Sequence, residues 1–270
     1  MNLDKRLNKV EKMLINRNLK LFKALIERIA GMLITNQIGI RTFEWLKQQI
    51  ELQINAYIQE FKEYLDRELV ETFTLSSKIA HETIKLPFNG VPTNAMLWFN
   101  ENFMNFEKTI MKNYAGDLMK TIENILTAGL ITGTPPNIIA KSLMQQILPT
   151  NKRRITVMVR DQLGNALQQG IWKTYQEYNE VIDKYKWVGP KDKRTTDWCK
   201  NRKKLTNENP WTFEQIQRYI ETNPKKLKGL EIRADHGTFL HPHIQCRHRL
   251  LAIPKSPEVV VSETIKSLKR

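Results

Sequence analysis

The sequence predicts a mainly α-helical protein, in which a long-helix N-terminal domain precedes a small α+β module with a short β-hairpin or sheet. Apolar residues recur every three or four positions over most of the first two thirds of the chain, and short extended runs occur only near its end. Gly and Pro number 11 each in 270 residues, which is few for a β-fold with many turns. We expect a helical interaction domain at 1–134, the α+β module at 135–254, and a basic tail at 255–270.

Two long helices are predicted first, over about 4–34 and 43–69. In the second helix, apolar side chains step by three or four positions without interruption from Phe43 to Leu69. Such a stripe is typical of a packing face. The pattern leaves open whether this face packs within the chain or on a partner.

A third helix is predicted over about 93–128, and the Gly and Pro residues of 129–136 end it. A short helix should then cover 137–147 and end before Pro149, because proline lacks the backbone N–H that a helix interior needs. The next helix is expected over 151–181.

After this helix the period of the sequence changes. Residues 185–188 form an extended run that Gly189-Pro190 closes. Thr212 is a good N-cap for a helix at 213–222, because its hydroxyl would accept a free backbone N–H. A last short strand is predicted at about 246–253.

The charge balance favours polyanionic partners. Lys and Arg total 43 against 28 Asp and Glu, a net charge of +15. Residues 184–204 alone hold nine Lys or Arg and two Asp, interleaved with Trp187 and Trp198. Basic and aromatic side chains together bind phosphate and stack on bases, or they form a rim around a core hairpin. We favour the rim for the Trp residues. For the basic residues, DNA and an acidic partner surface remain equal alternatives. The residues expected to make this contact are Lys191, Lys193, Lys200, Arg202, Lys203, Lys204, Arg247 and Arg249.

Both cysteines, Cys199 and Cys246, lie in a region that also holds four histidines, His236, His241, His243 and His248. Two cysteines are too few for the disulfide scaffold of a secreted protein. Zinc accepts thiolate and imidazole ligands, but Arg202 stands where a C-x-x-C pair would place a second cysteine. A zinc site, a disulfide and two separate thiols therefore remain alternatives, and no cofactor is required.

The geometry of a strand predicts which side chains of residues 246–249 share a face. Cys246 and His248 should point to one face and Arg247 and Arg249 to the other, because side chains alternate along a strand. Cys246 and His248 are thus the pair expected to meet Cys199. We predict a structural cluster without catalytic activity, made of Cys199, Cys246, His248, His241, Asp192 and Arg194. Within it, Asp192 would accept backbone N–H groups to close a turn, and Arg194 would bind a carboxylate or a pair of carbonyls.

These motifs resemble those of the phage Mu F-like minor head protein family, also called the phage head morphogenesis or minor capsid family. The similar pieces are Arg160-Asp-Gln162 on a helix, Asp192-Lys-Arg-Thr195 followed by Cys199, and His241-Pro242 followed by Cys246-Arg-His248. The resemblance covers about 135–254, with its specific motifs in 160–251. Many relatives carry C-x-x-C and C-R-C, whereas this chain keeps one cysteine of each pair.

The resemblance implies a non-enzymatic virion protein that acts in head assembly and in DNA packaging or ejection. Its partners would be the portal protein and other head proteins, with packaged DNA as a further partner and several copies in each particle. Its place would be the interior of the head near the portal, after synthesis in the host cytoplasm. No membrane segment is expected, because the most apolar early stretch, 26–40, contains too many polar residues to span a bilayer. The charged start of the chain also lacks the apolar core of a signal peptide.

The alternative is a metal-dependent His-type nuclease acting on phage or host DNA. Asp235-His236, followed by His241, His243 and His248, resembles a loose metal finger with a histidine as general base. The sequence lacks the carboxylate cluster and the ββα pattern that would support it. A DNA-binding protein acting outside virions is a third possibility, but no helix-turn-helix signature is present.

Overall fold

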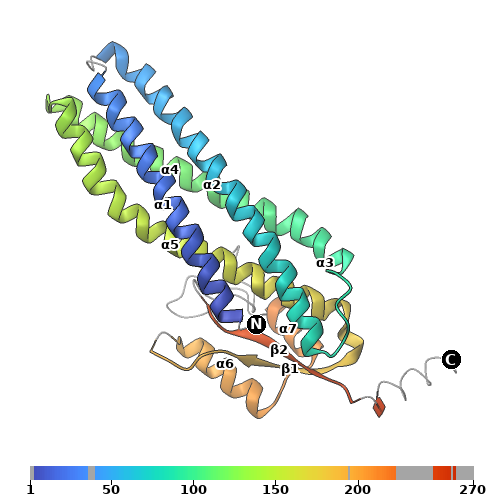
Figure 1. Ribbon diagram of the computed structural model, residues 1–270. Coiled ribbons are helices and arrows are strands. Elements are labelled where there is room, and N and C mark those ends of the chain that lie inside the picture. The colour runs from blue at the N-terminus through green and yellow to red at the C-terminus, as the bar shows by residue number, and fades with distance from the viewer. Residues whose placement is uncertain (1–2, 36–39, 194, 223–245, 257, 260–270) are drawn as a thin grey trace. The chain divides into compact units, whose positions relative to one another are not determined.

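The computed structural model describes residues 3–35, 40–193, 195–222, 246–256 and 258–259, and it confirms a mainly helical fold with a small sheet (Figure 1). The helices are α1 (Leu3–Thr35), α2 (Ile40–Thr83), α3 (Thr93–Trp98), the π-helix η1 (Phe99–Phe103), α4 (Met104–Ile131), α5 (Pro136–Glu177), the short 3₁₀ helix η2 (Asn179–Val181), α6 (Asp197–Glu208) and α7 (Phe213–Thr222). The strands are β1 (Ile182–Val188) and β2 (Arg249–Pro254). None of the helices in the described ranges is both long and apolar enough to cross a bilayer.

The chain forms two compact units. The first takes residues 1–68 and 104–160, and the second takes 69–103 and 161–270. Helices α2 and α5 each contribute residues to both units. The predicted division at residue 134 groups the residues differently, and it stays a prediction.

The first unit is a bundle of α1, the longer part of α2, α4 and the first half of α5, which run side by side (Figure 1). The apolar stripe of α2 lies in its core, and each stripe residue from Leu46 to Leu65 is buried. This answers the question that the sequence left open, because the stripe packs within the chain. Burying this stripe removes several large apolar side chains from water, and each contributes roughly 1.5–3 kcal/mol to the stability of the fold.

A buried polar chain crosses the same core. The Tyr57 hydroxyl donates to Oδ1 of Asn18 at 3.0 Å and lies 3.1 Å from the Tyr114 hydroxyl. Tyr114 in turn donates to Oδ1 of Asn151. Burial raises the pKa of Tyr114 to about 12, so its hydroxyl stays protonated as a donor. One residue from each of the four helices joins this chain, which fixes their register.

Helix α5 corrects the prediction of two helices separated at Pro149. Pro149 lies inside a single helix that extends from Pro136 to Glu177. The proline is exposed, so the carbonyl that loses its helical partner lies where water can hydrate it. The Thr150 hydroxyl also donates to the carbonyl of Gln146 at 3.2 Å. Buried residues on both sides of Pro149, among them Ile147 and Ile155, hold the two parts of α5 in the core.

The predicted helix at 93–128 is one helical stretch in three parts, α3, η1 and α4. The extra residue of the π-turn places Phe99 and Phe103 against each other, with ring centroids 5.1 Å apart and planes 11° apart. Phe99 also packs on Phe73 near the end of α2 at 4.4 Å. These aromatic contacts belong to the core of the second unit.

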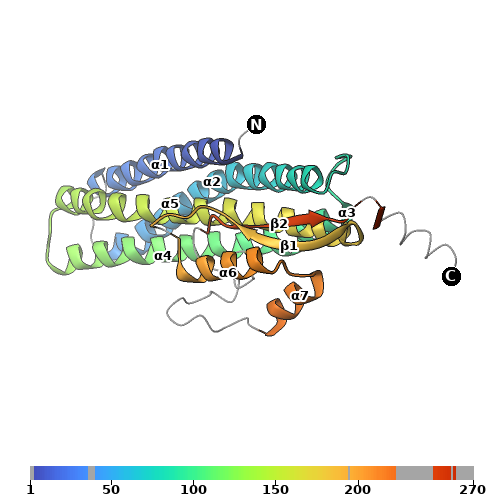
Figure 2. The same cartoon turned by 90° about the horizontal axis from the view of Figure 1, so that it is seen from below.

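In the second unit, β1 and β2 form an antiparallel pair that runs along the second half of α5 (Figure 2). Trp172 and Tyr175 of α5 contact Tyr185 of β1, with ring centroids 5.9 and 5.8 Å apart. On its other side α5 touches the end of α2 at Gly170, where an added Cβ would lie 1.8 Å from Oγ of Ser76. Glycine is required at this helix crossing because the two backbones leave no room for a side chain.

Two short helices follow β1. Helix α7 has the predicted bounds, and the Thr212 hydroxyl accepts the N–H of Gln215 at 3.3 Å while the Gln215 side chain accepts the N–H of Thr212 at 2.8 Å. This is a capping box. Helix α6 was not predicted. Its N-cap is Thr196, whose hydroxyl accepts the N–H of Cys199 at 3.3 Å.

Candidate functional site

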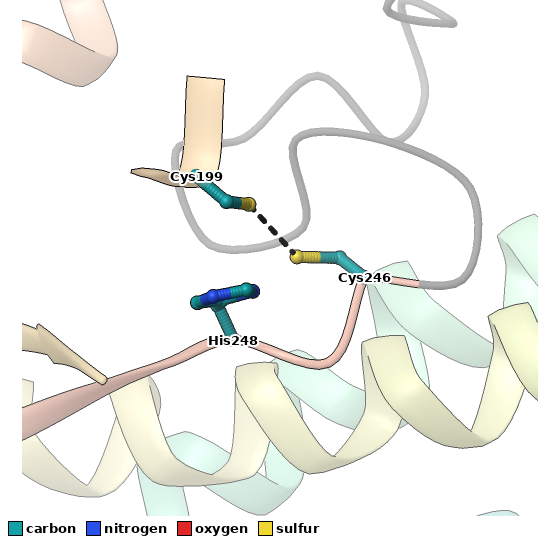
Figure 3. A group of neighbouring side chains, drawn as sticks. All are labelled: Cys199, Cys246 and His248. Atoms are coloured by element: carbon teal, nitrogen blue, oxygen red, sulfur yellow. Dashed lines mark hydrogen bonds between the residues drawn. The ribbon is translucent and has the colours of Figure 1, made fainter. Parts of the chain in front are cut away.

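Cys199, Cys246 and His248 form a buried group in the second unit. Their sulfur and ring-nitrogen atoms all lie within 4.8 Å of one another. Figure 3 shows the two thiols pointing toward each other, with the His248 ring beside them. Cys199 comes from the first turn of α6, while Cys246 and His248 come from the segment that leads into β2. The fold therefore brings together two segments that are 47 positions apart in the chain.

Three neighbours hold His248 in place. The ring of Trp187 stacks on the imidazole, with centroids 6.4 Å apart and planes 5° apart. The side chain of Gln168 donates to the backbone carbonyl of His248. Gly189 lies so close that an added Cβ would be 2.4 Å from Cδ2 of the ring. Sequence reasoning did not find these three positioning residues, although it placed a turn at Gly189-Pro190.

Trp187 is fully buried, so it belongs neither to the predicted basic rim nor to a base-stacking surface. It lies near the end of β1, opposite Leu250 of β2. Trp198 is half-buried and packs edge-on against Trp187, with ring centroids 5.8 Å apart. Trp187 thus packs directly on His248 of the Cys-Cys-His group, and Trp198 packs on Trp187.

The two cysteines form no disulfide, and their sulfur atoms are 3.7 Å apart. Burial raises the pKa of the Cys246 thiol well above its ordinary value, and its hydrogen bond with Cys199 raises it further. A thiol in this state is protonated at neutral pH and is a poor nucleophile. The group as it stands is therefore unsuited to covalent catalysis.

Hydrogen bonds of Thr195 close the turn before α6. The N–H of Thr195 donates to the carbonyl of Asp192 at 3.0 Å, and the Thr195 hydroxyl donates to the carbonyl of Pro190 at 3.0 Å. The Asp192 carboxylate accepts a hydrogen bond from Arg247 at 2.7 Å, which ties the turn to the segment before β2. Arg194 and His241 of the predicted cluster lie outside the described residues, as do His236 and His243.

The predicted contact residues divide into exposed and engaged side chains. Lys191, Lys193, Lys200, Lys204 and Arg247 are exposed in the second unit. Two of them have acidic partners, because Lys200 lies 2.8 Å from Asp197 and Arg247 pairs with Asp192.

Three further predicted contact residues are less accessible. Lys203 is half-buried and donates to the carbonyl of Gly189 at 2.8 Å, and Arg249 is half-buried in β2. For Arg202 the prediction of a surface contact is wrong. Its side chain is buried, with the guanidinium 4.4 Å from the ring centre of Trp198 and 4.9 Å from that of Trp211. Cation–π contacts with two indoles hold this charge inside the fold.

The types of donor atom in this group limit which metal ions it could bind. Within the described ranges, no Asp or Glu joins Cys199, Cys246 and His248. Magnesium and calcium prefer oxygen ligands, whereas two thiols and an imidazole suit zinc and other soft metals. The arrangement therefore fits a structural zinc centre better than a magnesium-dependent nuclease site.

A comparison with known protein families matches part of the region that holds this group. A family model described as Phage Mu protein F like protein matches residues 120–247, from within α4 to the residue before His248. No curated protein and no solved structure matches the chain. The matched range contains the Asp192–Thr195 turn and both cysteines. Residues 120–247, slightly less than half of the chain, thus resemble the Phage Mu protein F like family.

Proposed function

We propose that this protein is a minor head protein that associates with the portal vertex inside the phage head and acts there in assembly. The family match over residues 120–247 is the observation that carries this proposal. The resemblance to minor head proteins implies the portal and other head proteins as partners, and several copies in each particle.

The proposal includes no catalytic step. Among the described residues of the matched region and its edge, Cys199, Cys246 and His248 are buried in the interior. A structural role for these residues agrees with a protein of the virion.

We further propose that the protein contacts the packaged DNA. Five of the basic side chains predicted to make this contact are exposed, and the chain carries a net charge of +15. Phosphate neutralisation by such side chains binds DNA without sequence preference. A protein enclosed with the genome would make this contact during packaging or ejection.

The test is to separate procapsids, mature heads and tails from a lysate of phage carrying a tagged copy of the chain. We expect the tagged protein in procapsids and heads, and we expect the portal protein to be retained with it after mild disruption. Tail fractions serve as the control. Absence from purified particles would overturn the proposal, and presence in heads without portal association would overturn its portal part.

A nuclease assay addresses the alternative function directly. Plasmid DNA incubated with the purified chain and magnesium, manganese or zinc should stay intact. Cleavage that disappears with His248→Ala would instead support the nuclease.

A further inference from the structure

We propose that Cys199, Cys246 and His248 bind one zinc ion, which joins helix α6 to the segment entering β2 as a structural centre. The proposal rests on the donor atoms of the described residues and is independent of a role in the head. Thiolate and imidazole are the ligands of structural zinc, and zinc takes four of them in a tetrahedral arrangement. The described residues supply three.

The distance between the two sulfurs matches this geometry. Two thiolates about 2.3 Å from a tetrahedral zinc ion lie about 3.8 Å from each other. The sulfurs of Cys199 and Cys246 are 3.7 Å apart. A disulfide requires about 2.05 Å, so the two side chains are not placed as a bonded pair.

The histidine supplies a second, independent observation. His248 is 2% exposed, and no described residue forms a hydrogen bond with its Nε2 atom. A buried polar atom without a partner is unfavourable, and a bond to a metal ion removes that cost. The ring is already fixed by Trp187 and Gly189, as metal-binding histidines are fixed by their surroundings.

The net charge of a zinc ion bound by two cysteines and one histidine also suits a buried site. Binding replaces the two thiol protons, so one Zn²⁺ and two thiolates form a centre with no net charge and two protons go to solvent. A neutral centre suits a buried site, where an isolated charge is costly. The centre would close the chain between Cys199 and Cys246, and this restricts the unfolded state.

Metal analysis of the purified full chain tests the proposal. We expect about one zinc per chain, and a loss of most of it in Cys199→Ser, Cys246→Ser and His248→Gln. His81→Gln is the matched control. His81 is a second buried histidine of the same unit, and its Nδ1 lies 2.8 Å from the carbonyl of Ser77, away from this group. This variant should keep the zinc.

Two measurements on the wild-type chain test the proposal even if the variants fold poorly. Cobalt added to the metal-free wild-type chain should produce a thiolate-to-cobalt charge-transfer band, and one equivalent of zinc should abolish it. The chelated wild-type protein should also lose thermal stability and regain it when zinc is returned. Both measurements use the native sequence, so misfolding of a variant cannot account for them.

Three results would overturn the proposal. The first is a metal-free protein with two free thiols and no cobalt band. The second is a chain whose thiols react only after reduction, which would show a Cys199–Cys246 disulfide. The third is zinc that stays at full occupancy in all three ligand variants, which would place it elsewhere.

Discussion

At the residue scale, Gly189 and His248 show how one missing side chain shapes the buried group. An added Cβ at Gly189 would lie 2.4 and 2.6 Å from ring atoms of His248 and 2.9 Å from its Cα. The last of these atoms belongs to the backbone and cannot rotate away. The glycine is therefore needed for close approach, whatever its own backbone angles.

We expect Gly189→Ala to destabilise the second unit by about 1–3 kcal/mol, because the methyl group overpacks a site bounded by backbone. Urea unfolding with tryptophan fluorescence measures this, since Trp187 lies next to the site. Gly116→Ala is the control. Position 116 lies in the middle of α4 with no atom within 4 Å of an added Cβ, so alanine there should be neutral or stabilise by up to about 1 kcal/mol. Equal stability of the two variants would contradict the close approach.

At the element scale, α5 contains two prolines in different helical positions. Pro136 is its first residue, where the missing N–H has no helical partner in any case. Pro149 lies in the interior, where the missing N–H removes one hydrogen bond of the helix.

We expect Pro149→Ala to raise the free energy of unfolding by roughly 1–3 kcal/mol, because alanine restores that bond and is the best helix former. Pro136→Ala should give little or no gain. Thermal melts followed by circular dichroism compare the two variants. If Pro149→Ala were destabilising, the proline would have a packing role that its exposure does not reveal.

A buried acidic cluster connects α2 and α4 in the first unit. Glu107 of α4 is fully buried and lies 3.5 Å from the ammonium of Lys62, which also binds Asp66. Burial, followed by the charge of Asp66, raises the pKa of Glu107 from 4.5 to about 7, against the opposing effect of Lys62. At neutral pH the helices therefore hold a carboxyl group that is partly protonated.

This raised pKa predicts a loss of stability with rising pH. The folded chain binds the Glu107 proton more tightly than the unfolded chain, so its contribution is complete below pH 4.5 and is lost as pH rises through 7. We expect a decline on the order of 2–3 kcal/mol across that range. Glu107→Gln should remove most of it and stabilise the chain at pH 8.

Unfolding by guanidinium at several pH values measures the slope. Glu60→Gln, at an exposed position of α2, changes the charge equally and should leave the slope as in the wild type. An unchanged slope in Glu107→Gln would show that other groups cause the pH dependence.

At the scale of the whole molecule, the net charge of +15 creates a general attraction to DNA, to which local interactions with phosphates would add. The effect of net charge and the effect of local phosphate contacts can be distinguished by removing equal charge from two different surfaces. One variant reverses the exposed lysines around α6, namely Lys191, Lys193, Lys200 and Lys204. The control reverses four exposed lysines of α4 and α5, namely Lys108, Lys112, Lys120 and Lys141.

We expect the variant around α6 to bind double-stranded DNA more weakly than the control. The slope of log affinity against log salt should fall by about one for each phosphate that a lysine no longer neutralises. Fluorescence anisotropy over a range of salt concentrations provides both values. Equal weakening in the two variants would show that net charge alone causes the binding.

The sequence by itself determined the helical fold and the sidedness of its last motif. The stripe of α2 was visible because a helix that buries one face must repeat apolar residues every three or four positions. Alternation along a strand likewise separated Cys246 and His248 from Arg247 and Arg249. Thr212 marked the start of α7, because capping is a local interaction.

Only the tertiary structure decided the features that depend on contacts between distant segments. The helix continues through Pro149 because the residues around it are buried against other helices while the proline itself faces outward. Arg202, which the sequence placed at the surface, is buried because Trp198 and Trp211 enclose its charge. The 3.7 Å between the sulfurs of Cys199 and Cys246 exists because α6 and the segment before β2 meet in space, and no local pattern specifies that distance.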